Sequence, residues 1–155
     1  MIALNIAHLP IGIDNKFDYV AELAKDYLTD EEPVWVEDVA NDVQFTVYDT
    51  ENGTRELYLI AVDWYRDPAV IRRATVRVGE HRYGVEMPFG VMIKCVTRDG
   101  ILAYPHTEDG EVLAIDGNTV RVQGVGKVDF TFAKDGTAKT VTLDFTNDPV
   151  QEISV

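Results

Sequence analysis

Aromatic side chains are the group in this sequence with the most plausible binding chemistry, because a flat exposed ring can stack on the apolar face of a sugar. Several aromatic residues fall near strand ends or loops, and three of them are candidate sugar-stacking residues: Trp64, Tyr65 and Tyr104. Aromatic residues at such positions also cap the core of a β-sandwich, and the sequence leaves both interpretations open.

Residues that could act as nucleophiles or metal ligands are few and poorly arranged. Ser154 is the only serine and lies one residue from the end of the sequence. Cys95, the only cysteine, lies in an alternating run on the same face as Val91 and Ile93, so we predict a buried, inert thiol. The 3 histidines are scattered without metal-ligand spacing: His8, His81 and His106. We therefore predict no catalytic, metal-binding or cofactor-binding residue.

Carboxylates are abundant, so their proximity in the sequence carries little information. Those in or near expected hairpin turns are typical solvated acids: Glu51, Glu108, Asp109 and Glu111. A glycoside hydrolase places two carboxyl groups roughly 5–10 Å apart across a sugar ring, and a sequence does not reveal that distance. A small hydrolase that uses a carboxylate pair therefore stays open as an alternative.

The charge and composition of the chain argue against some classes of binding partner. The 155 residues carry a formal net charge of −13, which argues against binding to nucleic acid and to anionic membrane surfaces. No stretch approaches the ~20 apolar residues of a membrane span, and the first residues lack the basic start of a signal peptide. The hydrophobic fraction of 46% is that of a globular protein. The sequence assigns no cellular location.

The stretch from Arg55 to Gly79 predicts two strands of different kinds, separated by a loop. Leu57 to Val62 is a continuous apolar run, which predicts a strand buried on both faces. Ala74, Val76 and Val78 alternate with polar residues, which predicts a strand with one wet face. A loop containing Pro68 separates them.

The period of the apolar residues divides the chain into two parts. Residues 1–33 contain a short apolar run and the only convincing helix, expected over residues 15–28 with an apolar stripe that includes Phe17, Val20 and Leu28. From Val34 onward the period is 2, and Asn-Gly or Asp-Gly turns recur at residues 52–53, 99–100, 109–110, 116–117 and 135–136. We predict an antiparallel β-sandwich of about eleven short strands over residues 34–155, with one N-terminal helix.

The pattern of strand, proline-containing loop and strand in Arg55 to Gly79 resembles the β-domain that follows the catalytic domain in several bacterial glycoside hydrolases. Residues 85–90 and 100–105 resemble that domain's closing strands, and residues 1–33 resemble the strand and helix that end the preceding domain. The similarity covers roughly residues 1–105. The catalytic carboxylates of that family lie on the preceding barrel, so the resemblance maps none of them onto this sequence.

The resemblance implies a non-catalytic, structural C-terminal domain whose partner is a catalytic domain of the same polypeptide, with carbohydrate as a second partner. One alternative is a carbohydrate-binding module with its own aromatic platform. The other is the independent carboxylate-dependent hydrolase. A row of exposed coplanar rings would favour the module, and two facing carboxyl groups in a deep pocket would favour the enzyme.

Overall fold

The chain divides into two units, Met1–Glu32 and Pro33–Val155. The computed structural model describes residues 34–37, 43–50, 52–61, 71–88 and 90–155, all in the second unit. The predicted helix at residues 15–28 and the short apolar run before it lie outside the described residues.

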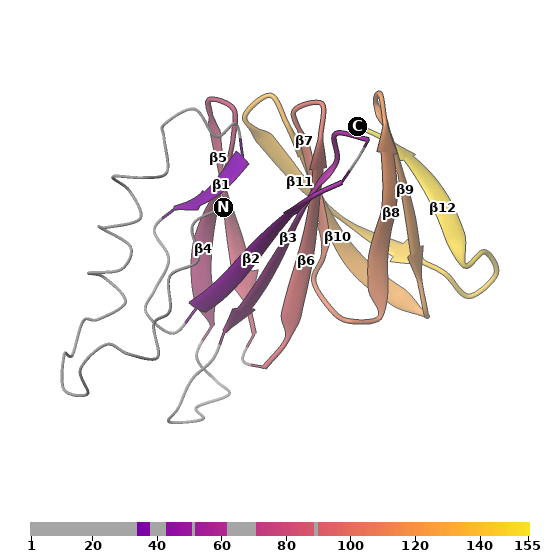
Figure 1. Ribbon diagram of the computed structural model, residues 1–155. Coiled ribbons are helices and arrows are strands. Elements are labelled where there is room, and N and C mark those ends of the chain that lie inside the picture. The colour runs from indigo at the N-terminus through magenta and orange to yellow at the C-terminus, as the bar shows by residue number, and fades with distance from the viewer. Residues whose placement is uncertain (1–33, 38–42, 51, 62–70, 89) are drawn as a thin grey trace. The chain divides into compact units, whose positions relative to one another are not determined.

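The described residues form twelve antiparallel strands in three sheets and no helix (Figure 1). Sheet A has the order β1-β4-β5, sheet B the order β11-β10-β7-β6-β3-β2, and sheet C the order β12-β9-β8. The strands are β1 (Val34–Glu37), β2 (Val43–Asp49), β3 (Arg55–Ala61), β4 (Arg72–Val78), β5 (His81–Met87), β6 (Met92–Arg98), β7 (Ile101–Pro105), β8 (Gly110–Asp116), β9 (Thr119–Gly124), β10 (Lys127–Lys134), β11 (Thr137–Asp144) and β12 (Val150–Ser154). The mainly β, antiparallel class predicted from the sequence is confirmed.

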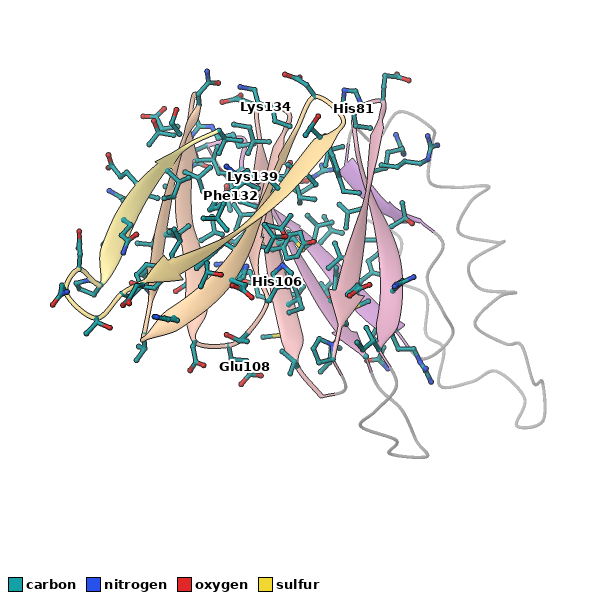
Figure 2. All side chains as sticks on the ribbon, turned by 180° about the vertical axis from the view of Figure 1, so that it is seen from behind. His81, His106, Glu108, Phe132, Lys134 and Lys139 are labelled. Atoms are coloured by element: carbon teal, nitrogen blue, oxygen red, sulfur yellow. The ribbon has the colours of Figure 1, made fainter. Side chains whose placement is uncertain are left out.

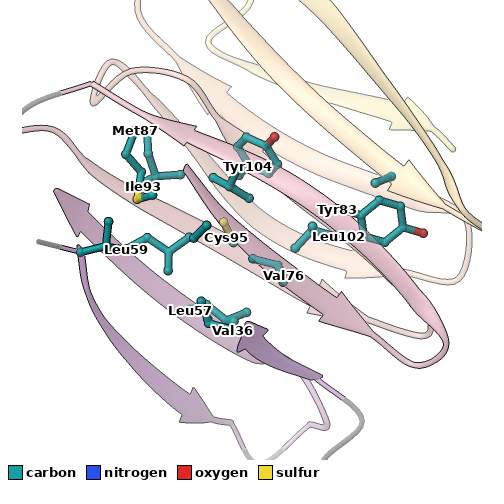
Figure 3. Close-up of a cluster of buried hydrophobic side chains, with 14 of the residues drawn as sticks. Val36, Leu57, Leu59, Val76, Tyr83, Met87, Ile93, Cys95, Leu102 and Tyr104 are labelled. Atoms are coloured by element: carbon teal, nitrogen blue, oxygen red, sulfur yellow. The ribbon is translucent and has the colours of Figure 1, made fainter. Parts of the chain in front are cut away.

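Sheet B has an apolar core on each of its faces. On one face its alternate residues pack against sheet A, which we call the A–B core (Figure 3); this core includes Leu57, Leu59, Ile93, Leu102 and Val76. On the other face they pack against sheet C, in the B–C core, which includes Val96, Ala103, Phe130, Val112 and Val122. Sheets A and C lie toward opposite ends of sheet B (Figure 1).

Strand β7 is covered on both faces of sheet B, and all of its residues are buried. Leu102 and Tyr104 belong to the A–B core, whereas Ile101 and Ala103 belong to the B–C core. A strand covered on both faces needs a continuous apolar sequence rather than an alternating one. The run from Ile101 to Tyr104 supplies it.

Strand β3 differs from its prediction. Leu57, Leu59 and Ala61 are buried, but Tyr58 and Ile60 on the opposite face are only partly buried. The reason is that β3 lies next to the edge strand β2, where sheet C does not cover sheet B. Strand β4 has the predicted alternation, with Ala74, Val76 and Val78 buried.

Most of the predicted Asp-Gly turns are present with the expected positive φ. At Asp109-Gly110, however, the glycine is not required by the backbone conformation of a turn. Asp99 and Gly100 have φ of 52° and 78°, as the tight turn between β6 and β7 requires. Gly110, in contrast, has no positive φ and is the first residue of β8. A Cβ there would lie 2.8 Å from both Phe130 Cζ and Val128 Cγ1, so the glycine is needed for close packing against the B–C core.

We predict that Gly110→Ala lowers the free energy of unfolding by about 1–3 kcal/mol, because the added methyl group overpacks the core against Phe130. Gly84→Ala is the matched control, since a Cβ at Gly84 meets no atom within 4 Å. Urea denaturation of the full chain measures both variants. Equal stabilities for the two variants would contradict the close packing at Gly110.

Candidate functional site

A group of interacting ionisable side chains is centred on Lys94 of β6. Its Nζ lies 3.1 Å from Glu56 Oε1 of β3 and 3.2 Å from Glu111 Oε1 of β8. Tyr58 donates a hydrogen bond of 2.8 Å to Glu56, and Gln123 donates one of 2.8 Å to Glu111. These five residues, the Lys94 cluster, connect two strands of sheet B with two strands of sheet C.

Alternation along the strands places the cluster on one face. Leu57 and Leu59 point into the A–B core, so Glu56 and Tyr58 point to the opposite face of β3. Tyr58 lies directly opposite Lys94 in the β3–β6 pairing, and direct partners project to the same side. Lys94 Nζ also lies 5.8 Å from the centroid of the Tyr58 ring, within the range of a cation–π contact.

The cluster holds its charged groups in their ionised forms. Burial alone would raise the pKa of Glu56, but hydrogen bonds from Tyr58 and Lys94 and the charge of Lys94 lower it below its ordinary 4.5. Burial alone would lower the pKa of Lys94, but its hydrogen bonds to Glu56 and Glu111 raise it above its ordinary 10.5. Burial and the hydrogen bond to Glu56 raise the pKa of the Tyr58 phenol.

These shifts move each pKa away from neutral pH. A general acid or base works best with a pKa near the pH of the reaction. The Lys94 cluster therefore suits charge pairing between sheets B and C better than proton transfer.

Beside the cluster lies an exposed aromatic ring. Tyr48 of the edge strand β2 is 56% exposed, and its ring meets that of Tyr58 edge to face, with 5.6 Å between centroids and 85° between planes. Gln44 and Thr46, on the same face of β2, are exposed as well. The Tyr48 ring is thus open to a ligand, but the two rings are perpendicular and do not form a coplanar platform.

The three predicted sugar-stacking residues fall in different places. Trp64 and Tyr65 lie outside the described residues, so their role stays a prediction. Tyr104 is only 4% exposed; its hydroxyl donates a 3.3 Å hydrogen bond to Gly84 O, and its ring stacks on His106 at 5.5 Å. The ring of Tyr104 thus packs between sheets A and B.

Cys95 is fully buried in the A–B core beside Ile93, which confirms the predicted buried thiol (Figure 3). Burial also raises the pKa of this thiol well above its usual range. A thiol that is both buried and protonated is a poor nucleophile.

Sequence reasoning did not single out the members of the Lys94 cluster or Tyr48. The alternation of Glu56 and Tyr58 with buried leucines could have placed them on one face. Lys94 and Glu111 are separated by 17 residues, and their contact depends on how sheet C packs on sheet B. No local pattern reveals that packing.

We predict that Lys94→Met lowers the free energy of unfolding by about 1–3 kcal/mol at pH 7, because it leaves the partly buried carboxylates of Glu56 and Glu111 without their cation. Lys127→Met is the control, since Lys127 is exposed and lies 4.0 Å from Asp144, and such pairs contribute little. Thermal or urea denaturation measures both.

The pH dependence of that difference follows from the lowered pKa of Glu56. Its contribution is present above its ordinary 4.5 and disappears as the pH falls through the lower pKa of the folded state. The stabilities of wild type and Lys94→Met should therefore converge in acid. A difference that is absent at pH 7, or that grows in acid, would contradict the pairing.

In the part of the chain that the structure describes, no group of three or more His, Cys, Asp or Glu is arranged to hold a metal ion. The same residues include no helix with the length and apolar character needed to cross a membrane. Comparison with family models, curated proteins and solved structures finds no match to the chain.

Proposed function

We propose that this chain is an accessory domain of the β-sandwich type, with one N-terminal helix, from a glycoside-hydrolase-like protein. In this role it supports a catalytic domain of the same polypeptide and carries out no reaction itself. The observation that carries the proposal is the Lys94 cluster, in which Lys94 pairs with Glu56 and Glu111 and so links sheet B to sheet C.

The sandwich part of the proposal is supported by the packing of the sheets. Sheet B shares the A–B core with sheet A and the B–C core with sheet C, and each pair of facing sheets buries alternate apolar residues. The helix belongs to the proposal only through the apolar stripe that the sequence predicts over residues 15–28.

The parent protein is proposed from the resemblance in Arg55 to Gly79. Strands β3 and β4 bound that stretch, and their alternating and buried residues are those that the resemblance uses. The preceding domain would carry the catalytic carboxylates, which is why the proposal assigns none here.

A carbohydrate-binding module is the second candidate, and the exposed ring of Tyr48 favours it. Stacking on such a ring would place a sugar over β2, near the side chains of Gln44 and Thr46. Retention on an immobilised polysaccharide that depends on Tyr48 would support this candidate over a purely structural role.

We expect the full 155-residue chain to hydrolyse none of a panel of aryl-glycosides, because Lys94 pairs with both Glu56 and Glu111 and lowers the pKa of Glu56, whereas the general acid of a glycosidase needs a raised pKa. Release of the chromophore measures turnover, with a known glycosidase as the positive control. Turnover that disappears when a single Asp or Glu, for example Glu56→Gln, is substituted would refute the proposed role.

A further inference from the structure

A groove of about 530 Å³ lies between β10–β11 and β12, on the side of the molecule that carries Phe132, Lys134 and Lys139 (Figure 2). β11 is the edge strand of sheet B and β12 is an edge strand of sheet C, and the two strands do not pair with each other. The packing of sheet C on sheet B therefore stays open along this side. A groove of this volume falls within the range of small-molecule sites.

The floor of the groove is apolar. Phe132 and Val141 belong to the face of sheet B that is turned toward sheet C, and they are faced by Ile153 of β12 and by Val155, which follows that strand. Val141, Ile153 and Val155 pack against the B–C core but are only partly buried. Side chains of this kind leave apolar surface available to the flat face of a ligand.

The rim of the groove carries positive charge. Lys139 lies directly opposite Phe132 in the β10–β11 pairing, so both side chains project to the side of the groove. Lys134 is held there by Asn118 Oδ1 at 2.7 Å and by Val155 O at 3.3 Å.

Lys139 is exposed, and it forms no hydrogen bond or ion pair with any residue that the structure describes. Asp135 is the one acidic side chain in the lining, and Lys134 already contacts Val155 O, so Lys139 is the cation left to pair with a ligand.

Hydroxyl-binding groups complete the lining. Thr137 supplies a hydroxyl and Asp135 supplies a carboxylate, both at exposed positions. An acyl chain forms no hydrogen bonds with such groups, whereas the hydroxyls of a sugar can donate hydrogen bonds to them and accept hydrogen bonds from them. The lining therefore combines an apolar floor, polar groups that pair with hydroxyls, and the exposed ammonium group of Lys139.

We propose that this groove binds a short acidic oligosaccharide through a uronic-acid unit. The C–H face of the sugar ring lies over Val141 and Ile153, its hydroxyls pair with Thr137 and Asp135, and its carboxylate pairs with Lys139. This ligand goes beyond the proposed accessory role and does not depend on it, because only residues that line the groove would bind it.

Isothermal titration calorimetry of the full chain with a trimer of galacturonate tests the proposal. We expect saturable binding that weakens as salt is raised, and that weakens about fivefold or more in Lys139→Gln. Lys127→Gln is the matched control, because Lys127 lies at the other end of the same hairpin and outside the groove, so its affinity should equal that of the wild type. Circular dichroism checks that both variants keep the fold.

Several results would overturn the proposal. Equal binding of a neutral trimer such as maltotriose would show that the carboxylate is not recognised. Binding of octanoate without binding of the galacturonate trimer would identify an acyl ligand instead. Absence of binding at millimolar concentration, or equal losses in Lys139→Gln and Lys127→Gln, would remove the groove as the site. An aryl-glycoside assay does not report on this groove, so failure of the proposed accessory role would be seen separately.

Discussion

The structure depends on covering both faces of sheet B. Strand β7 contributes Leu102 and Tyr104 to one core and Ile101 and Ala103 to the other, so neither sheet A nor sheet C alone would bury it. Apolar surface left in water on either face would oppose folding by roughly 25 cal/mol per Å². Sheets A and C are thus connected through the buried residues of β7, although no described strand of one sheet pairs with a strand of the other.

The candidate ligand-binding surfaces lie where sheet B is no longer covered on both faces. Toward β2, sheet C no longer covers sheet B, and the Lys94 cluster and the exposed Tyr48 occupy the border. Toward β11, the open side between sheets B and C leaves the groove with Lys139 at its rim. Polar bridges such as the one from Tyr104 to Gly84 hold sheet A in register at the other face. Both surfaces follow from the same offset of sheets A and C along sheet B.

The sequence predicts the strands well because apolar residues alternate with polar ones in strands buried on one face and form a continuous run in strands buried on both faces. It missed β12, since Gln151, Glu152 and Ser154 interrupt a strand that is buried on one side only in part. It also assigned β3 a second buried face, because the offset of sheet C is a property of packing rather than of local pattern. The same limit explains the Lys94 cluster and the groove, whose members come from strands that are distant in sequence. For Gly110, composition suggested a turn, whereas the close approach of Phe130 is the actual constraint.

Native-state hydrogen exchange followed by NMR tests the central claim most directly. If β7 belongs to both cores, the amides of Leu102, Ala103 and Tyr104 should exchange only by global unfolding, with a free energy equal to that from denaturation. Amides of the edge strands β2 and β12 should exchange at lower free energies. The account would be contradicted if the β7 amides exchanged with free energies well below that of global unfolding. Different exchange free energies for the residues of the A–B core and those of the B–C core would contradict it as well.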